Sequence, residues 1–215
     1  MKQKFFSQRK STISKILILA VALFSVNHGF SQKVTPGARV GTHFSNFKIS
    51  GASDVEPLYL SGSNAGIFST LHISKSFSIE PEVSISYQGS QLKYSNDEKV
   101  PTKLAYLQVP VVARYEFKNR LAFFAGPEVA FLLKATTGEE SGEKQNVKPA
   151  FKRKDFSVVG GAEYYFKSGI GIRANYTAGF TDIYKQASEK ITNYSFGLSV
   201  AYRFTAKKNR MADEK

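Results

Sequence analysis

The sequence LAYLQVPVVARYEF, residues 104–117, is followed by KNR, residues 118–120, and by LAFFAGPEVAFLL, residues 121–133. In both long segments every second residue is apolar, and the residues between them include Arg114 and Glu116. Alternation with a period of two predicts β-strands with one apolar face. The short polar break between the segments predicts that they form a β-hairpin.

Each arm of this hairpin is longer than an ordinary globular strand, which has about five or six residues. Each arm also exceeds the roughly 9–11 residues that cross a bilayer as a tilted strand. An unbroken apolar face opposite a face with Arg and Glu is typical of a transmembrane barrel, with the apolar side chains outward and the polar ones inward. The hairpin therefore predicts a β-structure that spans a membrane.

The same alternation recurs along the chain. It predicts strands at 37–47, 62–74, 77–88, 104–117, 121–133, 151–166, 170–180 and 194–204. Single-chain bacterial barrels have an even number of antiparallel strands. The predicted fold class is therefore all-β, an eight-stranded antiparallel up-and-down transmembrane β-barrel. Pro81, Pro110 and Pro127 fall inside strands, and we interpret them as β-bulges.

Short and long connections alternate. The predicted short turns are at Lys75, 118–120 and 167–169, and the predicted long links are 48–61, 89–103, 135–150 and 181–193. Outer-membrane barrels place short turns in the periplasm and long loops outside the cell. This alternation predicts an outer-membrane protein with both termini in the periplasm and the long loops extracellular.

The first 31 residues differ from the rest. Five basic residues precede or begin an apolar run at 16–26, and Gly29 and Ser31 provide small residues for a cleavage site. This pattern predicts a cleaved signal peptide over 1–31. The barrel then occupies 32–204, and 205–215 forms a polar periplasmic tail.

The chain carries a net charge of +13, which falls to +8 when residues 1–31 are removed. An exported protein rarely meets nucleic acid, so we interpret the charge as contact with anionic lipid headgroups. Lys152, Arg153 and Lys154 lie next to a predicted surface loop and are candidate contacts for lipopolysaccharide. Further expected partners are outer-membrane lipid and secretion or cell-envelope proteins. The chain has no Cys, and no cofactor is expected.

Alternation also predicts which polar side chains fill the barrel. The inward face of 121–133 continues to Lys134, although Lys134 also lies next to a predicted surface loop, and Asp155 faces inward at the start of 151–166. The predicted polar network of the lumen consists of Arg39, Glu80, Glu82, Arg114, Glu116, Glu128, Glu163, Arg173 and Arg203. Four arginines against five glutamates give a nearly neutral interior, in which Arg114 and Arg173 are the expected hubs. An eight-stranded interior is just wide enough for side chains to fill, so the barrel is not expected to be a pore; a small-solute porin is the alternative.

Catalysis is not expected. His43 and Ser45 lie on one strand face, and they are the candidates if the barrel is instead a lipid-modifying enzyme. Glu80 and Glu82 could act as an acid–base pair, although salt bridges to the inward arginines are the simpler role. The loop 138–149 is acidic but lacks the regular spacing of a calcium loop. A soluble exported barrel that binds a hydrophobic ligand is a further alternative.

Several short motifs occur in a characteristic order across the chain from Gly37 onward. These are Gly37-x-Arg39-x-Gly41, Pro81-Glu82, Tyr87-Gln88-Gly89, Tyr106-Leu107-Gln108-Val109-Pro110, Gly126-Pro127, Gly160-Gly161, Arg173-x-x-Tyr176 with Gly179, and Tyr202-Arg203-Phe204. In these motifs the chain resembles the PorT-like outer-membrane β-barrel family of Bacteroidetes-type bacteria. The resemblance implies an eight-stranded outer-membrane barrel whose activity is usually unassigned, with some members assisting protein secretion. For this chain we expect a structural, adhesive or secretion-accessory role. The polar tail after Phe204 departs from barrels that end on an aromatic residue.

Overall fold

The computed structural model describes residues 34–50, 55–95, 99–118, 120–138, 145–185 and 190–204. The predicted signal peptide and the polar tail lie outside the described residues. The long strands are β1 (Val34–Ser50), β2 (Glu56–His72), β3 (Phe77–Lys93), β4 (Lys99–Glu116), β5 (Leu121–Thr137), β7 (Lys154–Tyr165), β8 (Ile170–Gly179) and β9 (Lys190–Arg203). A two-residue strand, β6 (Gln145–Asn146), and a short 3-10 helix, η2 (Lys148–Ala150), lie between β5 and β7.

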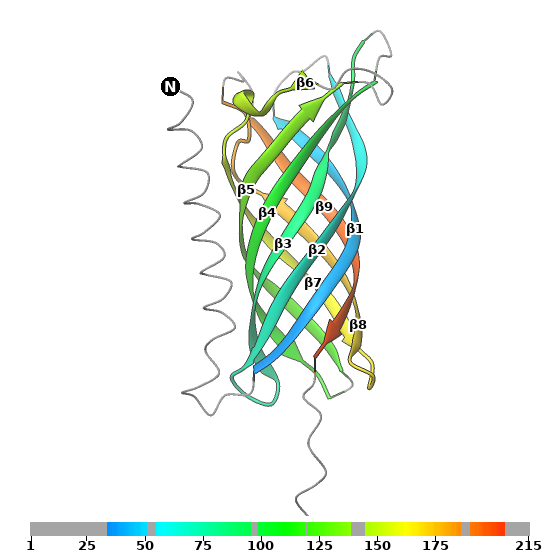
Figure 1. Ribbon diagram of the computed structural model, residues 1–215, viewed down its shortest axis with the longest axis vertical. Helices are drawn as coiled ribbons and strands as arrows, with labels where there is room; N and C mark the ends of the chain where they lie inside the picture. Colours follow the sequence, from blue (N-terminus) through cyan, green and yellow to red (C-terminus); the bar gives the residue numbers. More distant parts are fainter. Residues whose placement is uncertain are drawn as a thin grey trace, which may run out of the picture.

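The eight long strands form a closed ring. Each long strand pairs antiparallel with the next one along the chain, and β1 pairs with β9, for example through Val40 opposite Val200. Figure 1 shows the resulting barrel, with the strands tilted against its long axis. The predicted fold, an all-β eight-stranded antiparallel barrel, is confirmed.

Two of the predicted long loops are largely strand, so that part of the prediction is wrong. Strand β1 ends at Ser50 and β2 begins at Glu56. Strand β3 ends at Lys93 and β4 begins at Lys99. The hairpins continue because backbone pairing does not require an apolar face, and polar residues beyond the apolar band keep the ladder. The other two predicted loops remain long, and Figure 1 shows η2 and β6 at the same end of the barrel.

The β-bulges do not lie at the prolines. Pro81, Pro110 and Pro127 are paired without a shift of register, so their interpretation as bulges is wrong. One shift lies between β4 and β5, where Ala105 pairs with Lys134 but the next residue pairs with Leu132. The extra residue turns Lys134 outward, where it is exposed. Lys134 is therefore not a lumen residue, because a bulge inverts the alternation that placed it there.

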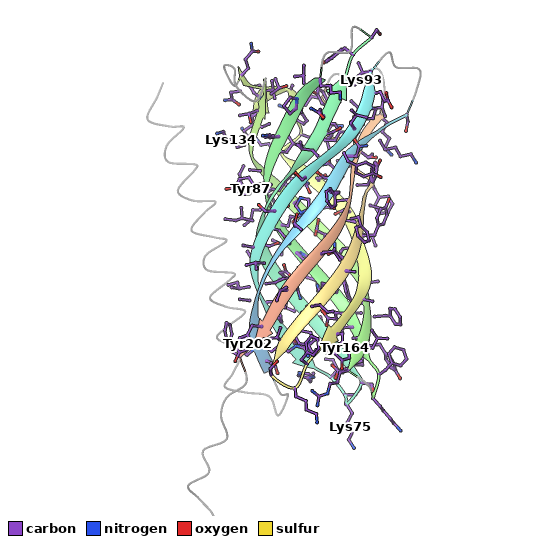
Figure 2. All side chains as sticks on the ribbon, turned by 90° about the vertical axis from the view of Figure 1, so that its right-hand side faces the viewer. Lys75, Tyr87, Lys93, Lys134, Tyr164 and Tyr202 are labelled. Carbon is purple, nitrogen blue, oxygen red and sulfur yellow. The ribbon has the colours of Figure 1, made fainter. Side chains whose placement is uncertain are left out.

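The outer wall is apolar over most of its height. Exposed side chains on the wall include Val40, Ile172, Leu198 and Val200. Aromatic pairs gather near the short turns, among them Tyr164 with Phe166 and Tyr202 with Phe204. In Figure 2 the labelled Tyr164 and Tyr202 lie near one end of the barrel, and Tyr87 lies toward the other end. An apolar band between aromatic girdles is the surface that a lipid bilayer covers. No helix in the described part of the chain is long and apolar enough to cross a membrane.

Replacing Leu198 with Arg tests the lipid-facing wall. Leu198 lies midway along β9 between the girdle residues Tyr194 and Tyr202, and its side chain is 51% exposed. An Arg near the bilayer midplane should lower the free energy of unfolding by about 2–4 kcal/mol. Denaturant unfolding from lipid vesicles measures the change, with Leu198→Met as the control. Equal stability of the two variants would contradict burial of this face in lipid.

Candidate functional site

The lower half of the lumen, toward the short turns, contains a buried network of ion pairs. Arg39 contacts Glu82 directly and Glu80 at 3.0 Å. Arg173 comes from β8, on the wall opposite Glu80 of β3. It lies 2.6 Å from Glu80 and 2.7 Å from Glu163. These five side chains, each at most 7% exposed, come from strands β1, β3, β7 and β8. The network therefore joins opposite walls and closes the cross-section.

Arg114 and Arg203 extend this network toward the short turns. The Nε atom of Arg114 donates to Glu163, and its terminal nitrogen lies 2.6 Å from Glu116. Arg203 lies 3.5 Å from Glu163 and 3.8 Å from Glu116. The guanidinium of Arg203 stacks on the ring of Tyr165 at 3.5 Å from the ring centre. Such stacking adds a cation–π attraction to the ion pairs.

Of the two predicted hubs, Arg173 lies within 4.0 Å of three glutamates, whereas Arg114 has two such partners among the described residues. Two carboxylates are hubs as well. Glu163 lies within 4.0 Å of all four arginines, and Glu80 of three of them. A carboxylate has two oxygens, each of which accepts several hydrogen bonds, so it can sit between guanidinium groups that surround it. Eight of the nine predicted residues are thus brought together in one network. Glu128 is the exception.

Glu128 lies above this network and contacts neutral groups. Its Oε1 atom accepts hydrogen bonds from Gln108 Nε2 at 3.0 Å and from Ser157 Oγ at 3.1 Å. Asp155, which the count of lumen charges left out, is also buried. The interior therefore has six acids against four arginines. The sequence does contain the signal for Asp155, because it alternates in phase with Ser157 and Glu163 on β7.

The space left inside the wall is small. A cavity of about 50 Å³ lies above the ion pairs, and His43, Asn64, Gln88 and Asn175 are among the residues that line it. A second cavity of about 10 Å³ adjoins it and reaches Asp155. About 10–15 Å³ is needed for one water molecule. The two cavities lined by the described residues therefore have room for a few waters.

The end of the barrel opposite the short turns is closed by an apolar cluster. Phe151 and Ile183, from the connections after β5 and after β8, are 0% and 1% exposed and pack with wall residues. The wall contributes Phe47, Leu104, Tyr106, Ala130, Leu132 and Ala135. We call the two connections, 147–153 and 180–185, the lid. No periodic pattern in the sequence identifies the lid, since its residues do not lie in long strands.

Polar contacts hold the two halves of the lid together. Lys152 Nζ donates to Asp182 Oδ2 at 2.8 Å, and Lys185 Nζ donates to the Pro149 carbonyl at 2.6 Å. Slight desolvation opposes ionisation of Asp182, but its hydrogen bonds with Lys152 and with the backbone N–H groups of Tyr184 and Ile191 outweigh it. The pKa of Asp182 is therefore below its usual value, and this carboxylate remains ionised at neutral pH.

The residues considered for catalysis have structural contacts. Ser45 Oγ donates to the Gly89 carbonyl and accepts from the Gly89 N–H, each at 2.8 Å. The hydroxyl thus fills a gap in the ladder near the bulge of β2. His43 faces the larger cavity, and its Nε2 atom has no hydrogen-bond partner among the described residues. Glu80 and Glu82 both form salt bridges with Arg39. This is the simpler of the two roles predicted for them, the other being an acid–base pair.

The three candidate lipopolysaccharide contacts have different positions. Lys152 is engaged with Asp182 in the lid. The carbonyl of Arg153 accepts the Leu132 N–H at 2.9 Å. Lys154 begins β7 and is exposed, and it pairs with Phe131, three residues before the exposed Lys134. Of the three candidates, the structure therefore brings Lys154 near a further exposed lysine, Lys134, which adjoins the predicted surface loop 135–150.

Known structures share this fold. The structure of Neisserial surface protein A has a TM-score of 0.56 and 11% identity, and the alignment covers 80% of this chain and 99% of that one. Ail of Yersinia pestis, solved with the heparin analogue sucrose octasulfate, has a TM-score of 0.48 and 12% identity over 80% and 99% of the two chains. OprG from Pseudomonas aeruginosa has a TM-score of 0.45 and 13% identity, and the alignment covers 81% of this chain and 98% of that one. At these identities the likeness to Neisserial surface protein A shows the fold alone.

No curated protein matches the sequence. Residues 30–185, however, match the family model described as outer membrane protein beta-barrel domain. That range includes all the strands except β9, and β9 closes the same ring against β1. The chain therefore belongs to the outer membrane protein beta-barrel domain family.

Proposed function

We propose that this protein is a non-catalytic, non-conducting component of the cell envelope that acts through the surface formed by its lid and long hairpins. Its role in this proposal is structural, adhesive or secretion-accessory; some of the PorT-like proteins that its motifs resemble assist protein secretion. The observation that carries the proposal is the double closure of the lumen. The ion-pair network fills the lower half, and Phe151 and Ile183 fill the opposite end.

The orientation follows from the loop lengths. The connections 73–76, 117–120 and 166–169 are short, and the lid lies at the other end of the barrel. Because outer-membrane barrels keep their short turns in the periplasm, we place the lid outside the cell and both ends of the chain in the periplasm. The contacts of Ser45 and of the Glu80–Glu82 pair support a barrel without a catalytic site.

A closed lumen predicts no ion conductance. The purified protein in planar lipid bilayers should give no stable conductance step, because guanidinium–carboxylate pairs occupy the cross-section that ions would have to pass. A reproducible, ion-selective step would contradict the proposal and favour a small-solute porin. Loss of a lipid-modifying activity in a His43→Ala variant would instead favour the enzyme.

A second prediction concerns the proposed contact with lipopolysaccharide. Lys134 and Lys154 are exposed on neighbouring strands, near the end of the barrel that carries the lid. A lysine near an anionic membrane surface contributes about 1 kcal/mol. The double variant Lys134→Gln/Lys154→Gln should therefore bind lipopolysaccharide roughly thirtyfold more weakly, and the difference should shrink in high salt.

Lys75 provides the control for this measurement. It lies in the turn between β2 and β3, and Figure 2 shows it at the opposite end of the barrel from Lys93 and Lys134. Lys75→Gln removes one positive charge, as Lys134→Gln and Lys154→Gln each do, but it should leave the affinity for lipopolysaccharide unchanged. If Lys75→Gln weakens binding as much per charge as the double variant, the effect comes from net charge, and no localised contact exists.

A further inference from the structure

The buried charges of the lumen do not balance. The four arginines are all engaged with the four glutamates of the lower network, which is therefore neutral as a group. Glu128 and Asp155 are buried as well, at 6% and 4% exposed. No described basic residue forms a salt bridge with either of them. An uncompensated charge inside a protein is strongly unfavourable, so these two carboxylates must either take up protons or have a counter-charge nearby.

The two carboxylates lie close together on one wall. Glu128 of β5 pairs with Ser157 of β7, and Ala130 pairs with Asp155, so the acids are diagonal neighbours on the inner face of adjacent strands. Both line the smaller cavity of about 10 Å³. That volume corresponds to about one occupant of the size of a water molecule.

The groups around this cavity are mainly oxygen donors with part of their capacity unused. Asn193 Nδ2 donates to Asp155 Oδ2 at 2.9 Å. The other oxygen, Asp155 Oδ1, is buried and has no hydrogen-bond partner. Gln108 uses its amide nitrogen to bind Glu128, which leaves its amide oxygen available. The hydroxyls of Ser157 and Ser195 also line the space.

We infer that the cavity between Glu128 and Asp155 binds one small hard cation, which supplies the missing counter-charge. Carboxylate, amide and hydroxyl oxygens are the ligands that such cations prefer. Among the described residues, no group of three or more His, Cys, Asp or Glu side chains could hold a metal ion. One Na⁺ balances one carboxylate while the other keeps a proton. Ca²⁺ would balance both carboxylates but takes about 6–8 oxygen ligands, more than a cavity of about 10 Å³ brings together, so we expect Na⁺.

The proposed cation site adjoins the apolar cluster that contains the lid residues Phe151 and Ile183. Asn193, which holds Asp155, also donates to the hydroxyl of Tyr106 at 3.4 Å, and Tyr106 belongs to the apolar cluster beneath Phe151. A ligand that binds the folded protein alone raises its stability with ligand concentration. The stability of the barrel should therefore depend on the identity of the cation in the solution.

The test compares unfolding midpoints of the detergent-folded barrel in NaCl, CaCl₂ and choline chloride at equal ionic strength. Choline is too large for the cavity, so it controls for screening. We expect the midpoint to rise with Na⁺ concentration and to stay constant in choline. Glu128→Gln and Asp155→Asn should each abolish the dependence on Na⁺, since each removes a charged ligand. Glu116→Gln, a substitution of the same type in the lower network, should keep it.

Each outcome decides the inference. A rise that occurs in Ca²⁺ and not in Na⁺ still supports a hard cation at this site, provided that both variants lose it. Identical midpoints in all three salts would overturn the inference. The inference would also be overturned if Glu128→Gln were more stable than the wild type in choline chloride while the wild-type midpoint did not change with Na⁺ or Ca²⁺. That result would mean that protons neutralise the carboxylates.

Discussion

Replacement of Glu163 with Gln is expected to lower the free energy of unfolding by about 3–5 kcal/mol, the usual cost of breaking a buried ion pair from one side. Glu163 is 2% exposed and accepts hydrogen bonds from Arg114 and from Arg173. The amide of Gln has no charge and offers a single acceptor oxygen. Two buried guanidinium groups would then lose their shared counter-charge, and neither could reach water without disrupting the wall.

Glu116→Gln is the matched control for this measurement. It belongs to the same network and lies 2.6 Å from Arg114, but its side chain is 30% exposed. Arg114 is buried but keeps its second partner, Glu163, and the Glu116 carboxylate is itself partly solvated. We therefore expect a loss close to that of exposed pairs, about 0–1 kcal/mol. Reversible urea unfolding from detergent micelles measures both variants. Equal losses would mean that burial does not set the strength of these pairs, and that the lower lumen is hydrated.

Replacement of Phe151 with Ala should have a similarly large effect at the other end of the barrel. The ring is 0% exposed and packs against Tyr184 with ring centres 4.4 Å apart. Removal of a fully buried Phe costs about 3–5 kcal/mol, from lost apolar burial and from the cavity that remains. The bridge between Phe151 and Tyr184 also joins the two parts of the lid, so both parts should become more susceptible to protease.

The Phe151→Ala variant should still conduct no ions, because the ion-pair network closes the lower half independently of the lid. Bilayer recordings of the variant therefore distinguish the two closures. A conductance step in this variant and not in the wild type would show that the lid alone closes the lumen. Phe156→Ala provides the control, since Phe156 faces outward at 50% exposed and should lose far less stability.

The alternation of apolar and polar residues determined most of the fold. It predicted eight strands and the inward faces of Arg39, Glu80 and Arg173 correctly, because side chains of a strand alternate between its faces regardless of the partner strand. The same local rule failed at Lys134. A bulge depends on how β4 and β5 fit together across the ring, and nothing in the period-two pattern records the extra residue.

The tertiary structure alone decided which charges meet. Arg173 and Glu80 are 93 positions apart in the chain, and their contact depends on the closure of the ring and on the stagger of its strands. Alternation assigns each residue to a face but not to a height in the lumen, so it could not separate the paired Glu163 from Glu128. The height of each carboxylate relative to the arginines decided that difference.

The lid likewise required the folded structure. Phe151 and Ile183 lie outside the long strands, where no periodicity indicates the side on which a residue packs. They are buried because the connections after β5 and β8 fold over the mouth and meet there. The sequence by itself therefore determined the wall of this protein and the polarity of its two faces. The closure of the ring determined the pairing inside the wall, and long-range packing of two loops determined how the end opposite the short turns is closed.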